Sequence, residues 1–516
     1  MSKKFVLIQA RTNSQRFFGK CLLKIKKQES IIFLYNRLKS KEYETYVLTS
    51  DNAQDNYLAE LLKKNKIKFF RGSLQNVSNR FLQFSKKLNQ KDILVRCTAD
   101  NLILDKFFIK KLIYEFQKSK KDYLKINRKK SRLPYGLAAE VFTVKSLKKY
   151  KAKNKFDEEH VTPPIKRGRN IKNLIIKSNN DLYKYRCTID TVFDYFYIKY
   201  LFEELKNSKK TKWFDLCKDL KKIKKETIEK KVKKVFSKLI IGTAQFMGDY
   251  GINNKNIINK EENIKKILDF AYKNNINFLD TAQAYYPAEK KIGKFIKRNR
   301  VKFKIISKFN LSNIHNLRSS LKKLNQKKIF GMLIHDPSKV HENNLEIIKK
   351  QFINNKPNFN FFGASMNSPN EYKILKKLKL CKIFQIPYNL IDNRWENILN
   401  KESMIHVRSV FLQGLLISNQ NNCPKNLLDE FNVIKKKLNF LVKKFSRYDT
   451  KDLLFNFVKS NKKVDKIIIG FDNLQQIEQI LFYMLREDFN YKEINFMKRK
   501  IGNVSLNFKC PTNWKN

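Results

Sequence analysis

The sequence predicts an α/β protein of two domains, an open sheet in the first half and an eight-stranded (β/α) barrel in the second. Its 516 residues exceed what one ordinary hydrophobic core organises. Short apolar runs alternate with polar, helix-compatible segments along the chain. In the second half these runs recur at the spacing of one strand, one helix and two short loops. Lys308 follows Asp280 by 308 − 280 = 28 residues, and His335 follows Lys308 by 335 − 308 = 27.

The composition is that of a folded but strongly basic chain. Apolar residues make up 42% of it and aromatic residues 13%, which is enough for packed cores. The 110 Lys and Arg against 47 Asp and Glu give a net charge of +63, and such a charge taken alone suggests a polyanion partner. The lysines are spread over the whole length, however, and no basic-plus-aromatic recognition motif is present. We therefore expect no nucleic acid partner and attribute the charge to a compositional bias of exposed positions.

Cysteine usage and hydropathy predict a cytoplasmic protein. The seven cysteines are scattered and never form a Cys-x-x-Cys pair, as expected of reduced thiols. The first residues lead directly into a strand pattern without a signal peptide, and no apolar stretch of about 20 residues could cross a bilayer. We expect no membrane partner.

Six apolar runs in the first half predict the strands of an open, largely parallel sheet. They are residues 4–10, residues 44–50, the run that reaches Ser73, the run that ends in Asp100, the run that begins at Ala138 and the run that ends in Asp190.

A loop rich in cations and hydrogen-bond donors follows the first of these strands. It contains Arg11, Ser14, Arg16 and Lys20, with Gly19 to allow a tight turn. In open parallel sheets the crevice after the first strand is where nucleotides bind, so this loop is a candidate phosphate site. The alternative is a solvated basic loop, which is common in a lysine-rich chain.

Asp100 and Asp190 place two carboxylates at predicted strand ends that face this loop. Carboxylate oxygens hold Mg²⁺, and neighbouring cations hold the phosphates of a magnesium nucleotide. The two aspartates are therefore the candidate metal ligands.

Six motifs of residues 4–205 resemble the cytidylyltransferase family that makes CMP-activated acidic sugars, especially its branch found with spore-coat and surface-polysaccharide genes. The motifs are IQARTNSQRFFGK, RGSLQNVSNRF, VRCTADNLILD, GLAAEVF, EEHVTPP and RCTIDTVFD. The resemblance implies a doubly wound domain that joins CTP to a sugar acid with release of pyrophosphate. It also implies that Arg11, Ser14, Arg16 and Lys20 bind the triphosphate and that Asp100 and Asp190 bind Mg²⁺. Positioning and charge neutralisation would supply most of the catalysis.

The motifs of this half depart from the family pattern at two places. Phe17 and Phe18 stand where the family usually has Leu-Pro, and Asn76 and Asn79 stand where acidic residues are expected. The loop is therefore expected to bend differently, and activity to be weak or altered if Asn79 replaces a needed carboxylate. Glu159 and the adjacent His160 would lie near the sugar or, alternatively, cap the amino terminus of a helix.

Residues 206–237 predict a lysine-rich, helical connection between the domains. Leu216, Leu220, Ile223 and Ile228 have loosely helical spacing, which favours one or two helices that close the first domain before a charged linker. The predicted division is 1–205, 206–237 and 238–516.

Eight apolar runs predict the barrel strands of residues 238–516. They are residues 238–244, residues 404–411, residues 464–470 and the five runs that end in Asp280 and near Lys308, His335, Ser365 and Asn389. Residues 288–297 predict a helix directly after the Asp280 turn.

The motifs of this half resemble the aldo/keto reductase family, in order and over residues 238 to about 506. They are LDTAQAYYPAEKKIG, SKFN, LIHDP, GAS, QIPYN and RSVFLQGLL. The resemblance implies an NAD(P)H-dependent oxidoreductase with a small carbonyl or sugar substrate, in which Tyr285 is the general acid and Asp280, Lys308 and His335 complete the site. It implies a cofactor site at Gly242, Ser365, Gln385, Ser409, Gly414, Gly470 and Asn473.

Carbonyl reduction explains why these residue types are needed. A hydride that arrives at the carbonyl carbon builds negative charge on oxygen, and a donor must protonate that oxygen. A free tyrosine has a pKa of about 10, so a lysine cation would ease the ionisation of Tyr285 while Asp280 holds Lys308 in place. His335 would donate to the substrate oxygen and orient it. The alternative is that Asp280 and Lys308 form a purely structural ion pair and that Tyr285 is a core aromatic residue.

Two departures from this family leave choices open. Tyr286 follows Tyr285 where the family has Gly, so Tyr286 is a rival for the acid role, although the spacing favours Tyr285. The turn after Ile469 contains Asp472 but no Lys or Arg. An NADP 2′-phosphate normally requires a cation there, so the cofactor is NADP(H) or NAD(H).

The sequence thus predicts a bifunctional fusion that serves one route to an activated sugar for surface polysaccharide biosynthesis. One alternative is an oxidoreductase whose first domain only binds a nucleotide or sugar. A second alternative is a basic nucleic-acid-binding protein.

Overall fold

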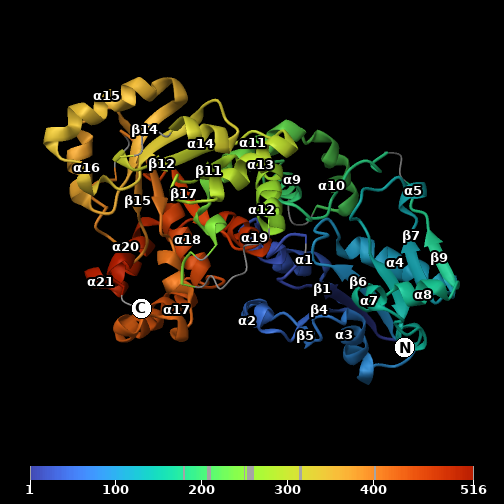
Figure 1. Ribbon diagram of the computed structural model, residues 1–516. Coiled ribbons are helices and arrows are strands. Elements are labelled where there is room, and N and C mark those ends of the chain that lie inside the picture. The colour runs from blue at the N-terminus through green and yellow to red at the C-terminus, as the bar shows by residue number, and fades with distance from the viewer. Residues whose placement is uncertain are drawn as a thin grey trace. The chain divides into compact units, whose positions relative to one another are not determined.

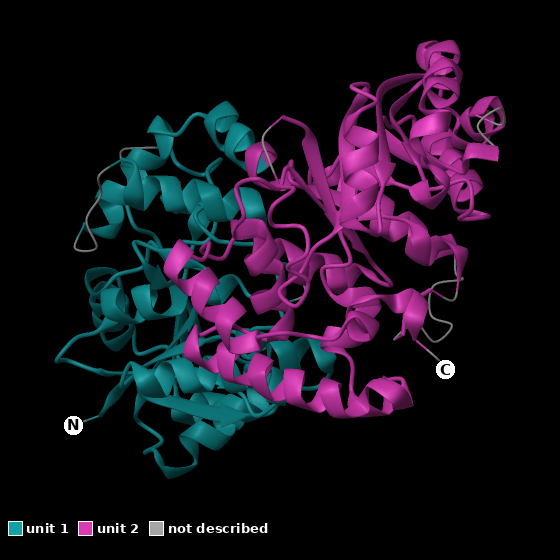
Figure 2. Ribbon diagram, turned by 90° about the vertical axis from the view of Figure 1, so that its left-hand side faces the viewer, with its two compact units in different colours: residues 1–232 teal, residues 233–516 magenta. Residues whose placement is uncertain are grey.

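The computed structural model describes residues 2–14, 16–177, 181–205, 211–248, 250–252, 261–312, 317–399 and 402–514. The chain divides into two compact units, residues 1–232 and residues 233–516 (Figures 1 and 2). The division falls inside helix α11 (Lys225–Phe236), whereas the predicted connection was residues 206–237, of which 206–210 lie outside the described residues.

The first unit is built on a mixed seven-stranded sheet. Strand β1 lies between β4 and β6 and is parallel to both, so the chain winds in both directions from the centre, as expected for a doubly wound fold. Only β8 runs antiparallel to its neighbours. The strands, in sheet order, are β5 (Phe69–Gly72), β4 (Glu44–Ser50), β1 (Lys4–Gln9), β6 (Ile93–Thr98), β8 (Glu140–Thr143), β7 (Tyr123–Ile126) and β9 (Ile171–Leu174).

The prediction of a strand that ends in Asp190 is wrong. That segment forms only an isolated bridge between Tyr135 and Arg186, because its backbone pairs with the loop at Gly136 instead of with the sheet. Gly136 has φ of +98°, and a Cβ there would lie 2.7 Å from Thr188. The sheet is completed instead by β7 and β9, two four-residue strands that the sequence did not predict.

Helices cover the sheet, and several begin at short polar side chains that accept a backbone N–H, as N-caps do. Asp105 accepts from Phe108 N, and Thr191 and Asp194 form a capping box. The helices are α1 (Ser30–Leu38), α2 (Asn56–Lys64), α3 (Val77–Phe84), α4 (Lys106–Ser119), α5 (Arg128–Ser131), α6 (Val144–Lys149), α7 (Lys155–His160), α8 (Pro163–Arg167), α9 (Val192–Glu203) and α10 (Trp213–Asp219), followed by α11.

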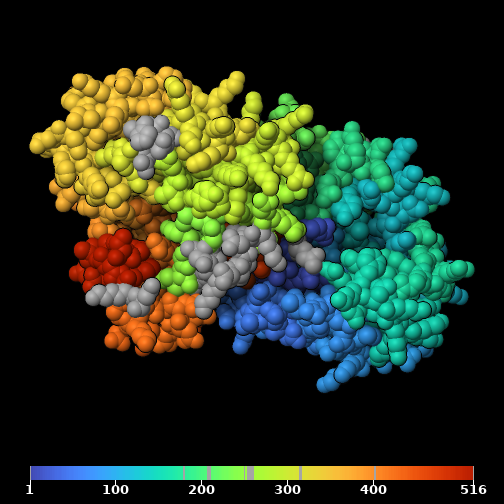
Figure 3. Space-filling view, in the orientation of Figure 1, coloured from blue at the N-terminus to red at the C-terminus, as the bar shows by residue number. Residues whose placement is uncertain are grey.

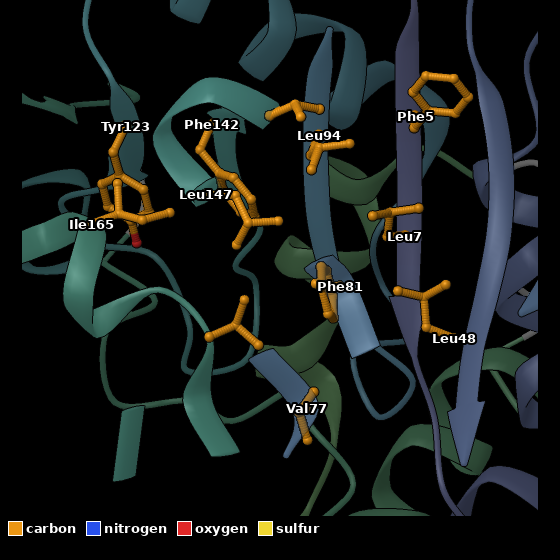
Figure 4. Packing of buried hydrophobic residues seen from close by; sticks show 12 residues of the cluster. Phe5, Leu7, Leu48, Val77, Phe81, Leu94, Tyr123, Phe142, Leu147 and Ile165 are labelled. Atoms are coloured by element: carbon orange, nitrogen blue, oxygen red, sulfur yellow. The ribbon is translucent and has the colours of Figure 1, made fainter. Parts of the chain in front are cut away.

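Figure 4 shows a core of this unit, where strand residues such as Leu7, Leu94 and Phe142 pack against Phe81 of α3 and Ile165 of α8. The predicted helices of the connection are present as α10 and α11. Leu216, Leu220 and Ile228 are fully buried, so these helices pack on a core.

The second unit is a closed barrel of eight parallel strands, all at the predicted positions. They are β10 (Leu239–Gly242), β11 (Phe278–Asp280), β12 (Lys304–Phe309), β13 (Ile329–Ile334), β14 (Phe359–Ser365), β15 (Cys381–Pro387), β16 (Met404–Arg408) and β17 (Lys466–Gly470). Each strand pairs with the next along the chain, and β17 closes the ring on β10. Ile240, Ile306, Leu333, Ile383 and Ile468 fill the interior below the mouth.

An outer layer of helices surrounds this barrel, and the predicted helix after the Asp280 turn is α13. Figure 3 shows the side chains of the yellow and light orange segments at the surface of the upper part of this unit. The helices are α12 (Glu261–Lys273), α13 (Ala288–Asn299), α14 (Leu317–Leu324), α15 (Leu345–Asn355), α16 (Pro369–Lys376), α17 (Leu428–Lys444), α18 (Thr450–Ser460), α19 (Leu474–Met484), α20 (Tyr491–Ile501) and α21 (Leu506–Lys509).

The helices α13 and α14 cross closely at Gly293. A Cβ at this glycine would lie 1.9 Å from the Lys323 carbonyl oxygen, so only glycine permits this approach of the two backbones. None of the described helices has the length and apolar character that crossing a lipid bilayer would require.

Candidate active sites

A buried ion pair lies at the mouth of the barrel. Asp280 ends β11, and Lys308 lies near the end of the adjacent β12. The carboxyl end of each strand therefore contributes one charged side chain to the mouth of the barrel. Lys308 Nζ lies 2.5 Å from Asp280 Oδ1 and also donates to the Thr281 carbonyl oxygen at 2.8 Å. The two residues are 1% and 4% exposed, so each charge depends on the other for its stability.

Two further strand ends hold the carboxylate of this pair. Gln385 Nε2 donates to Asp280 Oδ2 at 2.7 Å, and Ser365 Oγ donates to Gln385 Oε1 at 3.0 Å. Ser365 and Gln385 are two of the predicted cofactor residues, and in the structure they fix the orientation of Asp280. Each of the two carboxylate oxygens of Asp280 therefore accepts a hydrogen bond.

Tyr285 and His335 lie against Lys308. The Lys308 ammonium is 5.0 Å from the Tyr285 ring centroid, and the Tyr285 and His335 rings meet edge to face with centroids 5.6 Å apart. Burial, together with the charges of Lys308 and Arg408, lowers the pKa of His335 to about 4, so this histidine is neutral at pH 7. The structure thus brings the four predicted residues of the barrel together.

The rival tyrosine points elsewhere. Tyr286 is 72% exposed, and it lies outside the lining of the large cavity beside the ion pair, whereas Tyr285 is part of that lining. The geometry therefore favours Tyr285, in agreement with the spacing argument.

The cavity beside Tyr285 has a volume of about 390 Å³, within the range of small-molecule and cofactor sites. Five of the seven predicted cofactor residues line it, namely Gly242, Gln385, Ser409, Gly414 and Gly470. Of the other two, Ser365 bonds Gln385, and Asn473 accepts from Gln476 N as the N-cap of α19.

The cavity wall has features that fit a dinucleotide. Gly470 is packed against the Gln245 side chain, which would lie 1.9 Å from an added Cβ, so only glycine lets Gln245 pack this closely against the cavity wall. Asp472 Oδ2 accepts from Gln476, while the buried Asp472 Oδ1 has no hydrogen-bond partner among the described residues. That oxygen is an acceptor suited to a sugar hydroxyl.

Three cavity residues received no role from the sequence. Lys451 comes from α18, Tyr250 from the loop after β10, and Arg408 from the end of β16. Lys451 is a cation in the lining of the same cavity as Asp472, where it donates to Gln479 at 3.4 Å. It could not be found by reading the turn at Asp472, because it stands 21 positions earlier (472 − 451 = 21). Arg408 lay within a quoted motif, but only its side-chain direction reveals that it faces the cavity.

The first unit gathers its predicted site around Lys20. The Lys20 ammonium lies 2.6 Å from Asp100 Oδ2, 3.1 Å from Asp190 Oδ1 and 2.8 Å from the Ile189 carbonyl oxygen. All three charged residues are buried. The two candidate metal ligands therefore converge, although Asp190 is delivered by a loop and not by a strand.

The other basic residues surround this cluster. Arg16 donates to Asp190 at 2.7 Å, and Arg11 forms a 2.9 Å ion pair with Glu159. Ser14 lies in the tight turn of the same loop, where its backbone N–H donates to the Thr12 carbonyl oxygen at 3.0 Å.

Two expectations for this half are corrected by the helices. Glu159 and His160 end helix α7 and do not cap an amino terminus, because Asn154 is the N-cap there. Asn76 caps α3 by accepting from Asn79 N, and the Asn79 side chain is exposed. A carboxylate at Asn79 would therefore lie outside the buried cluster.

The donor set at Asp100 and Asp190 fits Mg²⁺. No group of three or more His, Cys, Asp or Glu side chains in the described ranges is placed to hold a metal, but Mg²⁺ is usually held by one or two carboxylates plus substrate phosphates. The Lys20 ammonium between the two carboxylates shows that this position favours a cation.

The second half matches the family model described as "Aldo/keto reductase family" over residues 238–501. The chain belongs to the aldo/keto reductase family. The first half of this aldo/keto reductase matches the model described as "Cytidylyltransferase" over residues 5–240. The protein is therefore a fusion of a cytidylyltransferase domain with an aldo/keto reductase barrel, and both are enzyme domains.

Two relatives match the cytidylyltransferase domain. An uncharacterised protein of Methanocaldococcus jannaschii is 34% identical over 196 residues, which are 37% of this chain and 79% of the relative. The spore coat polysaccharide biosynthesis protein SpsF of Bacillus subtilis is 26% identical over 216 residues, which are 40% of this chain and 88% of the relative.

Solved structures resemble each half. A cytidylyltransferase from Leptospira borgpetersenii matches with 29% identity and a TM-score of 0.40, over 44% of this chain and 97% of its own. The holo form of the aldo-keto reductase AKR11C1 from Bacillus halodurans matches with 17% identity and a TM-score of 0.44, over 53% of this chain and 95% of its own.

Proposed function

We propose that the barrel reduces the carbonyl group of a small molecule or sugar with NADPH or NADH. The observation that carries this proposal is the placement of Tyr285 between Lys308 and His335 at the edge of the cavity. Tyr285 lines the cavity, and its ring lies close to the Lys308 ammonium and the His335 imidazole. A titratable hydroxyl beside a fixed cation and a neutral imidazole supports general-acid catalysis at this position.

Each residue has a distinct task in this reaction. The nicotinamide, when bound, supplies a hydride to the carbonyl carbon. Tyr285 gives its hydroxyl proton to the carbonyl oxygen, so that carbonyl plus hydride plus proton gives the alcohol. The Lys308 cation stabilises the tyrosinate left behind, and Asp280 keeps Lys308 in place. His335 is neutral and can therefore donate an N–H to the oxygen without adding a second charge beside Lys308.

The test is Tyr285→Phe, with Tyr286→Phe as the matched control. NADPH and NADH are titrated by fluorescence, and turnover is measured with a panel of small aldehydes and keto sugars. We expect both variants to bind the cofactor as the unmodified protein does, and only Tyr285→Phe to lose about 10²- to 10⁴-fold in kcat. Equal losses in both variants, or none in Tyr285→Phe, would reject Tyr285 as the acid.

We further propose that the cytidylyltransferase domain transfers CMP from CTP to a sugar acid and releases pyrophosphate. The Lys20, Asp100 and Asp190 cluster supports this, because it combines a phosphate-binding cation with two carboxylates suited to Mg²⁺. Arg11 and Arg16 lie on the same loop as further candidates for the triphosphate. The similarity to the spore coat polysaccharide biosynthesis protein SpsF favours a role in surface polysaccharide biosynthesis, which would be cytoplasmic.

Mg²⁺-dependent release of pyrophosphate from CTP, measured with a panel of sugar acids, tests this second activity. The tested variant is Lys20→Met. The control is Lys24→Met, which removes a lysine four positions further along the chain and outside the cluster. Release by Lys24→Met but not by Lys20→Met is expected. CTP binding without release by the unmodified protein would instead indicate a binding module, and loss of CTP binding on addition of DNA would favour a nucleic-acid-binding protein.

A further inference from the structure

Arg408 has an unusual set of partners for a cation in the wall of a cavity. It ends β16 and lines the cavity together with Tyr285. Its guanidinium donates to the Met366 carbonyl oxygen at 2.9 Å and to Asn367 Oδ1 at 2.6 Å. It also lies 3.3 Å from both Ser365 Oγ and Ser409 Oγ. All four acceptors are electrically neutral.

The nearby carboxylates are occupied elsewhere. Asp280 is paired with Lys308, and Glu371 accepts the backbone N–H groups of Asn367 and Ser368 at the start of α16. Among the ion pairs that the described residues form, none includes Arg408. Burial lowers its pKa, and the negative charges of the surroundings oppose this only in part. A partly desolvated guanidinium without a counter-ion favours an anion in the cavity.

Hydrogen bonds connect Arg408 to the reaction centre. Its Nε lies 3.3 Å from Ser365 Oγ, Ser365 donates to Gln385 at 3.0 Å, and Gln385 donates to Asp280 at 2.7 Å. The Arg408 charge also contributes to the low pKa of His335. An anion bound by Arg408 would therefore lie in the cavity that Tyr285 also lines.

We propose that Arg408 binds a carboxylate of the substrate, so that the barrel acts on oxo acids such as uronic or ulosonic sugars. This rests on the reductase function proposed above. Four of the five guanidinium N–H groups already donate within the protein. The remaining Nη1 N–H can donate to a carboxylate oxygen in a charge-assisted hydrogen bond, and the fixed plane of the guanidinium aims it in a way that a lysine ammonium cannot match. Both domains would then act on acidic sugars, which gives the fusion a shared chemical class of substrate.

The shared chemistry is an oxyanion, and a phosphate group of the cofactor is the competing source. The experiment compares Arg408→Gln and Arg408→Lys with Lys382→Gln. The control removes one positive charge from the neighbouring strand β15, at an exposed position. All proteins are saturated with NADP⁺ or NAD⁺, and the probes are acetate against acetamide and D-glucuronate against D-glucose.

The first measurement is the ¹⁵N NMR signal of the Arg408 Nε–H, identified by its absence in Arg408→Gln. We expect acetate to shift this signal saturably and acetamide to leave it unchanged. We also expect D-glucuronate to bind at least about 10-fold more tightly than D-glucose to the unmodified and Lys382→Gln proteins, equally weakly to Arg408→Gln, and between these limits to Arg408→Lys.

Two results would overturn the proposal. One is the same shift with acetate and acetamide, or none with either. The other is a loss of NADPH or NADH affinity in Arg408→Gln as large as the loss of D-glucuronate affinity, which would assign Arg408 to a cofactor phosphate. Because both measurements use binding and not turnover, they remain readable in Tyr285→Phe. Failure of the reductase and failure of the carboxylate site are thereby distinguished.

Discussion

At the scale of single residues, the barrel site depends on one buried charge pair. Asp280 has two acceptor oxygens, one for Lys308 and one for Gln385. Removing its charge leaves the Lys308 ammonium buried without a counter-ion, whereas removing both charges does not.

We therefore predict that Asp280→Asn lowers the stability of the barrel by about 3–5 kcal/mol, whereas the double variant Asp280→Asn, Lys308→Met recovers most of this loss. Both variants should lose reductase activity, because the single variant no longer fixes the position of Lys308 and the double variant has no cation beside Tyr285. Thermal unfolding followed by circular dichroism measures the first effect. A double variant no more stable than the single one would show that the pair is not coupled as the geometry indicates.

His335 gives a prediction about the pH dependence of catalysis. Its pKa is lowered to about 4, so the imidazole stays neutral from pH 5 upward. We expect kcat/KM for carbonyl reduction to show no acid limb near pH 6.5, the ordinary value for histidine. A limb near pH 6.5 that disappears in His335→Gln would contradict the expected protonation state.

His406 makes the barrel sensitive to acid. It is fully buried in β16, neither ring nitrogen has a partner among the described residues, and burial, with a smaller contribution from Lys466, lowers its pKa to about 3. Between pH 6.5 and 3 the unfolded state binds the proton and the folded state does not. Stability should therefore fall as the pH falls through this window and be unaffected above pH 6.5.

We predict that His406→Leu reduces this loss of stability below pH 6.5. Urea unfolding of both proteins at pH 7.5 and pH 5 measures it. Parallel pH profiles of the two proteins would refute the assignment to His406.

At the scale of elements, the crossing of α13 over α14 fixes the position of the catalytic turn. Helix α13 begins three residues after Tyr285, and its Glu289 accepts from Ser307, the neighbour of Lys308, at 3.0 Å. Gly293 permits the close approach of the two helices. A side chain at this position must push α13 away from α14.

We predict that Gly293→Ala destabilises the barrel by about 1–3 kcal/mol, the usual cost of overpacking, and lowers reductase activity because the Tyr285 turn moves. Lys297→Ala, at an exposed position of the same helix, is the control and should change neither quantity. Thermal unfolding and turnover measure the two effects. A Gly293→Ala protein as stable as the control would mean that the crossing is loose.

The elements also show how far the sequence alone leads. The eight barrel strands could be predicted because each is a short apolar run, and those that end near Asp280, Lys308 and His335 recur at 28 and 27 residues. Asp280, Lys308 and His335 fall at or near strand ends by the same pattern.

The strands β7 and β9 escaped prediction because each is short and interrupted by polar residues, Lys125 in β7 and Lys172 with Asn173 in β9, so neither stands out as an apolar run. The run before Asp190 alternates like a strand, but its partner is a loop at Gly136, and no local pattern reveals a distant partner.

The site residues follow the same division. Tyr285 and Lys20 each lie in a sequence motif that resembles one enzyme family, so their positions in the motif predicted their roles. Arg408 and Lys451 reach the cavity through the folding of the barrel, far from the other cavity residues in sequence. Lysine is so frequent in this chain that a single functional lysine carries no compositional signal.

At the scale of the whole molecule, the two sites use separate residues on separate units. We predict that Tyr285→Phe leaves the rate of pyrophosphate release from CTP unchanged within about twofold and that Lys20→Met leaves carbonyl reduction unchanged, because substitutions at sites that share no residues or partners have independent effects. The two assays, run on both variants, measure this. A variant that impairs both reactions would show that the units communicate.

The two sites also have one feature in common, a lysine ammonium seated on aspartate carboxylates, and for Lys20 this sets the order in which ligands can enter. Lys20 is shared between Asp100 and Asp190. A divalent ion that binds alone would have to displace the Lys20 ammonium, which would then lose its carboxylate acceptors. A triphosphate that arrives with the ion offers Lys20 new oxygens and releases both carboxylates at once. In the proposed transferase reaction, the cluster would therefore bind metal and nucleotide together and disfavour binding of either one alone.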